Sequence, residues 1–355
     1  MYADLAFELD GRDADLMNAH GAWGALLVPF GIGSVRAALG LATYVPDQFV
    51  LRLYSVPATQ PRFVMWDNQP HRTVFDIALS ARFAELVAVG AGVSALGGAE
   101  GEVSFELGSR PGRTVSEAAI DSRLPARYAP IAGILVTPAA WLRFGLRYSE
   151  PLAADVQLDA RANTNVEGIL QGTTLVRTVG QNYFTPREVA LGAAADLAAW
   201  TLLAELTFQQ WSELEQVSYD VELDVDLGID TPVFGFTEPE PRWHDVLSPH
   251  FGIERDVDLG SDRELTLRAG YWYAPTPVPD QPGLTSFADS NRHVLTLGSG
   301  FRFGDIGLPL TVEVAGQLHM LEEREMRKAS VVEPGGNHRI DGRVLAVFCG
   351  LRLEL

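Results

Sequence analysis

Short segments in which apolar and polar residues alternate, joined by links that alternate between long and short, limit the fold of this chain more than any other feature. In the last segment Leu345, Val347, Cys349 and Leu351 fall on one face, and the residues between them fall on the other. This period of two is typical of β-strands with one apolar face. We predict strands at residues 2–9, 20–29, 34–44, 73–83, 87–106, 127–137, 141–160, 187–197, 200–224, 248–257, 263–274, 292–303, 310–321 and 342–355.

The links between these segments sort by length. The short ones centre on Gly31–Gly33, Ala84–Glu85, Pro138–Ala140, Ala198–Ala199, Gly260–Asp262 and Gly304–Gly307. The long ones are Val45–Arg72, Leu107–Ala126, Arg161–Pro186, Val225–Leu247, Pro275–Asn291 and Glu322–Asp341. Bacterial transmembrane barrels have short periplasmic turns and long external loops on an even number of strands, whereas a soluble sandwich has no reason to sort its loops by end. The pattern therefore predicts an all-β fold, a transmembrane antiparallel up-and-down β-barrel of about 14 strands.

Composition excludes other classes. No stretch of eighteen or more apolar residues lacks a charge, which argues against a transmembrane helix. The formal net charge of −19 argues against a nucleic-acid partner, because such partners need a basic surface. Cys349 is the only cysteine, so it forms no internal disulfide, and we expect it to point to lipid. We expect residues 1–355 to form a single barrel domain, with a signal peptide absent from this chain because Met1 leads directly into an alternating strand.

The second predicted strand is apolar on both faces. Its apolar residues fall on both faces of the strand: Trp23 and Leu27 on one, and Leu26 and Val28 on the other. The lumen face of a water-filled porin is instead polar. Apolar lumen positions suit a pore for hydrophobic cargo, and contact with a hydrophobic plug is the alternative.

Several segments resemble the FadL/TodX family of outer-membrane transporters for long-chain fatty acids and aromatic hydrocarbons. The segments are Arg268–Asp280, which contains Thr-Pro-Val-Pro-Asp, then Ala288–Arg292 (Ala-Asp-Ser-Asn-Arg), Thr207–Leu214 and Arg147–Pro151. The resemblance implies a barrel in the outer membrane of a Gram-negative bacterium, with hydrophobic substrate diffusing from a surface site into the lumen and leaving through a gap near a kinked strand. It implies hydrophobic small molecules, membrane lipid, lipopolysaccharide and the barrel-assembly machinery as partners. The family's N-terminal plug is expected to be absent from this chain.

A channel for fatty acids needs apolar walls and a few cations. Each CH₂ group moved from water to an apolar site gains about 0.8 kcal/mol, while a buried carboxylate needs a cationic partner. The substrate-channel candidates are Arg147, Glu205, Trp211, Arg268, Trp272, Arg292 and Arg302, with Arg143 as a further lumen arginine. The alternative, which we favour for most of these arginines, is pairing with Glu205, Glu313, Glu188 or Asp76 in structural networks of the lumen. For Trp211 and Trp272 the alternative is an interfacial aromatic girdle.

Catalytic and cofactor motifs are not found. The sequence has no Gly-x-Ser-x-Gly elbow and no phosphate-binding glycine loop, so we expect neither an enzyme nor a cofactor. The acidic run Asp220, Glu222, Asp224, Asp226 and Asp230 is better explained as a solvated external loop than as a Ca²⁺ site.

The predicted function is a passive outer-membrane channel for long-chain fatty acids or other hydrophobic compounds. A general polar porin or structural barrel is the first alternative and would show a wide, charged lumen. A soluble all-β binding protein is the second and would bury its leucines and valines between two sheets.

Overall fold

The computed structural model describes residues 1–33, 35–47, 59–67, 71–108, 115–166, 170–217, 219–226, 233–236, 239–260, 262–304, 309–333 and 335–354. No helix in these residues has the length and apolar character needed to cross a membrane.

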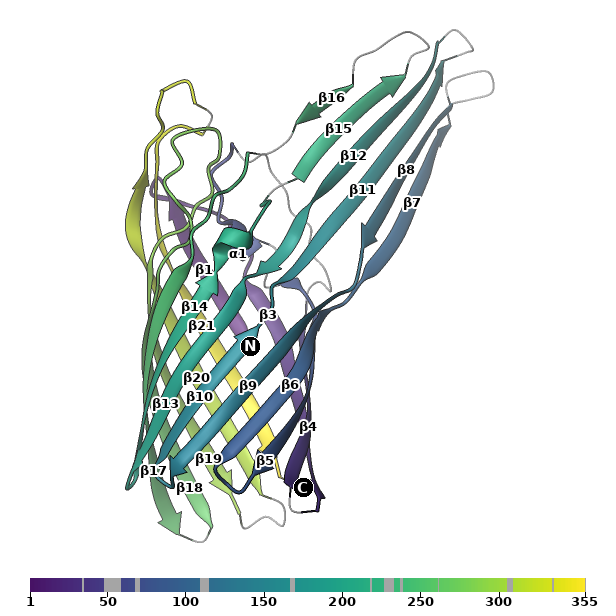
Figure 1. Cartoon of the computed structure of the whole chain (residues 1–355). Helices are drawn as coiled ribbons and strands as arrows, with labels where there is room; N and C mark the ends of the chain where they lie inside the picture. Colours follow the sequence, from purple (N-terminus) through teal and green to yellow (C-terminus); the bar gives the residue numbers. More distant parts are fainter. Residues whose placement is uncertain are drawn as a thin grey trace.

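Fourteen of the described strands form a closed antiparallel barrel (Figure 1). They are β1 (Tyr2–Leu9), β3 (Ala19–Ile32), β4 (Val35–Pro46), β5 (Val74–Phe83), β6 (Val87–Leu96), β9 (Arg127–Ala139), β10 (Leu142–Ser149), β13 (Arg187–Leu197), β14 (Trp200–Gln210), β17 (Val246–Gly260), β18 (Arg263–Ala274), β19 (Arg292–Phe303), β20 (Leu310–Met326) and β21 (His338–Leu353). β1 pairs with β21 on one side and, through Tyr2 and Ala3, with β3 on the other. The two-residue β2 (Arg12–Asp13) pairs with the end of β1. The predicted barrel is confirmed.

The apolar faces of the strands point away from the lumen. On β5, Phe75, Ile77 and Leu79 are 49%, 50% and 55% exposed, while Asp76, Ala78 and Ser80, which alternate with them, are half-buried on the other face. The register carries this alternation around the barrel, because each residue pairs with a residue of the same face on the next strand. A soluble sandwich requires these side chains to be buried between two sheets, so that alternative is inconsistent with the structure.

Aromatic residues mark both ends of the wall. Trp141 and Trp200 lie at the end with the short turns and are 53% and 40% exposed. Tyr128, at the opposite end of β9, is 71% exposed. Two such girdles, one at each membrane–water interface, are typical of transmembrane barrels.

The short turns lie where the link lengths predict them. Ala84 and Glu85 both have positive φ, 46° and 57°, as the central residues of a primed β-turn do, and Leu86 N donates to Phe83 O at 3.1 Å across this turn. Residues 34, 261 and 305–308, within or beside three of the predicted short links, lie outside the described residues, as do parts of the predicted long links.

Three of the predicted strands are too long, and three of the predicted external links are wrong. Residues 87–106 divide into β6 and β7 (Ala99–Gly108) at Gly97 and Gly98. Residues 141–160 divide into β10 and β11 (Leu152–Val166) at Pro151, and residues 200–224 into β14, a 3₁₀ turn (Trp211–Glu213) and β15 (Tyr219–Asp226). The links 107–126, 161–186 and 225–247 contain β8 (Val115–Leu124), β12 (Leu170–Thr185) and β16 (Phe234–Phe236).

These additional strands form a second sheet outside the barrel. Its order is β16-β15-β12-β11-β8-β7, and it projects beyond the end with the long links (Figure 1). We call it the external sheet. Period-two alternation continues from the barrel into this sheet, so periodicity alone does not mark where the barrel ends.

Candidate functional site

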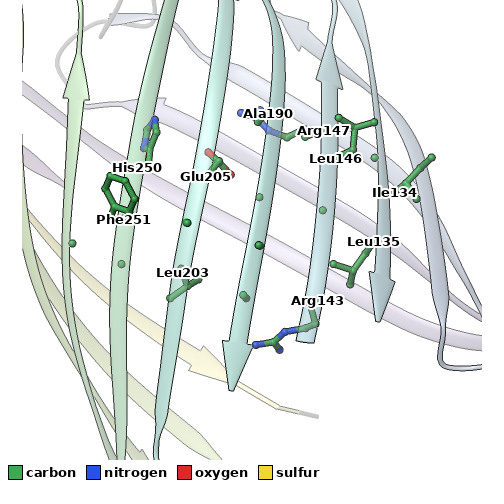
Figure 2. Close-up of a pocket in the computed structure, with 18 of the residues that line it drawn as sticks. Ile134, Leu135, Arg143, Leu146, Arg147, Ala190, Leu203, Glu205, His250 and Phe251 are labelled. Carbon is green, nitrogen blue, oxygen red and sulfur yellow. The ribbon is translucent and has the colours of Figure 1, made fainter. Parts of the chain in front are cut away.

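The lumen contains a cavity of about 1160 Å³. Glycine and alanine contribute much of its wall, and Gly90 pairs directly with Gly133, Gly145 with Gly192, and Gly252 with Gly270. Since glycine has no side chain, these pairs leave open space beside the wall. Figure 2 shows the polar members of the wall, among them Arg143, Arg147, Glu205 and His250, on β10, β14 and β17.

The lumen arginines are paired with carboxylates from other parts of the chain, most of them on neighbouring strands. Arg143 bonds Asp196 at 2.8 Å, Arg147 bonds Glu188, and Arg302 bonds Glu354 at 3.3 Å. Arg268 bonds Glu254 at 2.5 Å and Glu313 at 3.3 Å. Of the pairings considered from the sequence, Arg147 with Glu188 and Arg268 with Glu313 are present. These pairs reduce the cost of placing charge in the barrel interior.

Four of the candidate residues line the cavity and three do not. Arg147, Glu205, Arg268 and Trp272 are in its wall. Arg302 lies near the short-turn end of β19, Arg292 at its opposite end, and Trp211 above the lumen among the external links. In the described part of the chain Glu205 has no ion pair; it accepts a hydrogen bond from Thr207 Oγ1 at 3.0 Å and faces His250 across the strand pair.

Aromatic rings form a column above the cavity. His250 stacks on Trp272, with ring centroids 5.7 Å apart and planes at 15°. His319 meets Trp272 edge-on at 5.7 Å and Trp66 at 6.1 Å. The Arg292 guanidinium lies 5.1 Å from the centroid of the Trp66 ring, within the range of a cation–π contact. The column joins the cavity to the link between β4 and β5.

That link closes the outer end of the lumen. Phe63 and the short helix α1 (Val64–Asp67) pack inside the barrel mouth, where Phe63 stacks on Phe7 with centroids 4.6 Å apart. Trp66 meets Phe7 edge-on at 5.3 Å. The closure was not predicted from the sequence, although the run Phe63-Val64-Met65-Trp66 is unusually apolar for a solvated loop and is the signal that marks it.

A second apolar cluster covers α1 from outside. It consists of Phe184, Trp211, Leu214, Trp243, Val246, Val278, Phe287 and Met326, with Val64 and Met65 of α1 packed against it. Trp211 and Trp243 have ring centroids 5.5 Å apart. We call this cluster, together with Phe63 and α1, the outer cap. A small pocket of about 40 Å³ lies between Trp211, Trp243 and the link that carries α1.

The link between β18 and β19 supports the outer cap through buried polar groups. Gln281 both donates to the Phe287 carbonyl at 2.7 Å and accepts from the Phe287 amide at 2.8 Å. Asp289 is fully buried and accepts a hydrogen bond from Thr276 Oγ1 at 2.5 Å. Burial raises the pKa of Asp289 above its ordinary value of 3.8, and the opposing effects of Arg292, Thr276 and Arg324 are smaller.

This pKa shift makes the stability of the outer cap depend on pH. The contribution of neutral, protonated Asp289 to stability is fully present below pH 3.8 and is lost as the pH rises through the higher pKa of Asp289 in the folded state. Asn is isosteric and does not titrate, so D289N is expected to remove this part of the pH dependence. Thermal unfolding followed by Trp fluorescence from about pH 3 to 8 measures it, since Trp211 and Trp243 lie in the outer cap. An identical pH dependence in D289N and the parent would contradict the assignment.

The acidic run that was considered for metal binding is largely part of the external sheet. Asp220, Glu222, Asp224 and Asp226 lie on one face of β15, and Asp230 is outside the described residues. No group of three potential ligands that could hold a metal occurs among the described residues.

The fold and the lumen define a class of protein: a transmembrane barrel with a lipid-facing apolar exterior and a lumen closed at one end by an apolar cap. The chain belongs to the outer membrane protein transport protein family (OMPP1/FadL/TodX), whose family model matches residues 127–354. It is therefore an outer-membrane protein of the Gram-negative type, from a family that transports hydrophobic compounds, as the sequence resemblance predicts.

Solved structures agree with this family at the level of the fold. A FadL homologue of Pseudomonas aeruginosa superposes with a TM-score of 0.60 at 17% identity, covering 99% of this chain and 87% of the homologue. The toluene transporter TodX of Pseudomonas putida gives 0.55 at 14% identity, covering 99% and 88%. The toluene transporter TbuX of Ralstonia pickettii gives 0.50 at 15% identity, covering 100% and 88%. No curated protein matches the chain in sequence.

Proposed function

We propose that this protein conducts long-chain fatty acids or other hydrophobic compounds by diffusion, from capture at the outer cap to the lumen cavity, with no catalytic step and no energy input by the barrel. The observation that carries the proposal is the apolar outer cap, which leads through the aromatic column to a cavity whose wall contains many glycines and alanines. Membrane lipid, lipopolysaccharide and the barrel-assembly machinery are proposed as partners on the basis of this location.

The size and lining of the path suit such a cargo. The cavity of about 1160 Å³ is slightly larger than the usual range for small-molecule sites, about 300–1,000 Å³, so a flexible chain fits it in several conformations. A sixteen-carbon chain gains roughly 12 kcal/mol on leaving water for an apolar environment, at about 0.8 kcal/mol per CH₂. The apolar residues of β3 that face the lumen extend the apolar lining, since Trp23 and Leu27 pair with Tyr44 and Gly40 on the lumen face.

Uptake into proteoliposomes tests the proposal. Vesicles that contain the full chain are expected to accumulate oleate and toluene several-fold faster than empty vesicles, while the entry of arabinose stays near the empty-vesicle rate. Arabinose entry equal to or faster than oleate entry would instead support a general polar porin. That candidate has its own support in the ion pairs of the lumen, such as Arg143 with Asp196.

Arg147 is the best-placed cation for a carboxylate head group. Its side chain is 59% exposed, lines the cavity and is paired with Glu188. R147M is expected to reduce oleate uptake by roughly tenfold and to leave toluene uptake unchanged, because a hydrogen bond to a charged group contributes about 1.5–3 kcal/mol. The matched control is R255M: Arg255 lies outside the lumen, 4.9 Å from the ring centroid of Trp200. If R147M takes up oleate and toluene at the same rates as the parent, Arg147 does not bind the head group and serves only its ion pair with Glu188.

A further inference from the structure

The external sheet is a single layer that extends far from the barrel. β11 and β12 contain 15 and 16 residues, which corresponds to about 50 Å at roughly 3.3 Å per residue. In Figure 1 the sheet leans away from the barrel axis. A sheet with an apolar face is normally stable only when another layer covers that face.

The two faces of the external sheet differ sharply in charge. One row of directly paired residues crosses all six strands and consists of Val103, Ile120, Ala160, Val176, Leu223 and Phe234. The adjacent row on the same face, Gly101, Ser122, Leu158, Thr178 and Val221, is also uncharged. We call this the uncharged face. Val103 and Phe234 on it are 54% and 59% exposed.

The opposite face is acidic. Its corresponding row consists of Glu102, Asp121, Asp159, Arg177 and Glu222. Arg177 lies 3.3 Å from Asp159 and 3.7 Å from Glu222, so one arginine is shared between two of the four carboxylates. Exposed charges of this density favour contact with water over contact with an apolar partner.

Packing at the base of the sheet shows which face points outward. Ala153 packs against the cluster of the outer cap, which lies over the lumen. Leu152 and Ala154, on the other face of β11, pack against Leu96 and Ala129 of the barrel wall. β11 therefore passes between the cap and the wall, and the face that carries Leu152 and Ala154 points away from the barrel axis. Val156, Leu158 and Ala160 continue that face into the uncharged face.

We infer that the uncharged face of the external sheet lies on the outer leaflet of the membrane, with lipid as its partner. Above the wall the face points outward, in the same direction as the barrel exterior that contacts lipid, and the lean of the sheet turns it toward the membrane surface. The sheet lies beyond the end of the barrel that Tyr128 marks as the outer interface, since β8 ends at Leu124 and the barrel strand β9 begins at Arg127. The acidic face is then turned away from the anionic phosphates of the outer leaflet, where like charges would repel it. This is the arrangement of an amphipathic surface element, built here from strands.

The inference goes beyond the proposed function and holds for any cargo. Site-directed spin labels on the full chain test it. In a C349S background, the single substitutions V103C, I120C and V221C place labels on the uncharged face. The substitutions E102C, D121C and E222C are matched controls, one residue away on the same strands and on the acidic face. The protein is reconstituted at one copy per nanodisc of phosphatidylethanolamine and lipopolysaccharide.

For each label, the measured quantity is the ratio of its collision rate with dissolved oxygen to its collision rate with a water-soluble nickel chelate. This ratio is expected to be several-fold higher for labels on the uncharged face than for the controls. Brominated lipids should quench fluorophores placed at the same three positions and not those at the controls. Equal access of the nickel chelate to both faces would overturn the inference. Protection of these labels from the nickel chelate only when each nanodisc holds two copies would also overturn it, because the covering partner would then be a second chain. Protection only after oleate is added would overturn it as well, because the partner would then be cargo.

Discussion

Replacing both Phe63 and Trp66 with alanine is expected to open the outer end of the barrel and to raise its single-channel conductance in planar bilayers by roughly tenfold, because an apolar constriction excludes water and ions until it is widened. In the parent, Phe63 stacks on Phe7 and Trp66 lies between Phe7 and His319. The variant removes two large rings where the link between β4 and β5 closes the lumen.

Three buried polar atoms in the contact between this link and the wall lack hydrogen-bond partners among the described residues, which favours opening. Trp66 Nε1, His319 Nδ1 and Arg292 Nε are buried without hydrogen-bond partners in the described part of the chain. Each such group costs about 1–3 kcal/mol, so the closed link is held chiefly by its rings. W141A is the matched control, because Trp141 is exposed at the short-turn end. Unchanged conductance in a folded F63A/W66A barrel would show that other residues close the lumen.

The strands of the barrel could be predicted because they combine two independent signals. Period-two alternation placed β18 and β19 within a residue of their observed bounds, and link length assigned each turn to one end. Neither signal describes what happens beyond the membrane. Gly97 and Gly98 divide a continuous alternating run into a barrel strand and an external strand, and alternation has the same period on both sides of the break.

The site was predictable as a set of residue types and not as a set of contacts. Strand parity placed Arg143, Arg147 and Arg268 on the lumen face, since parity depends on the sequence alone. Their partners depend on register: Arg268 meets Glu254 because β17 and β18 pair opposite these two residues. Strand parity does not predict the position of Trp211, because the chain turns at residues 211–213 and parity indicates a face of the barrel only within a strand.

Filling the cavity is expected to block transport without disturbing the wall. In G145W the new side chain projects into the lumen, where a Cβ at position 145 has one neighbour within 4 Å, Leu135 Cδ1 at 3.9 Å. A ring beside the wall occupies the space left by the pair Gly145 and Gly192. Uptake of oleate and toluene into proteoliposomes is expected to fall by roughly tenfold, because pore diameter limits the passage of both.

G316W is a closely matched control. Gly316 pairs with Leu297 and Val347 on the lipid-facing side, and a Cβ there also has one neighbour within 4 Å, Ala346 O at 3.9 Å. Replacing glycine inside a strand removes an entropic penalty of about 0.5–1 kcal/mol, so both variants are expected to fold. A shift in heat-modifiable gel mobility reports that folding. Equal transport by folded G145W and G316W would place the path away from the glycine-lined cavity, whereas a loss confined to G145W assigns the cavity to the path itself.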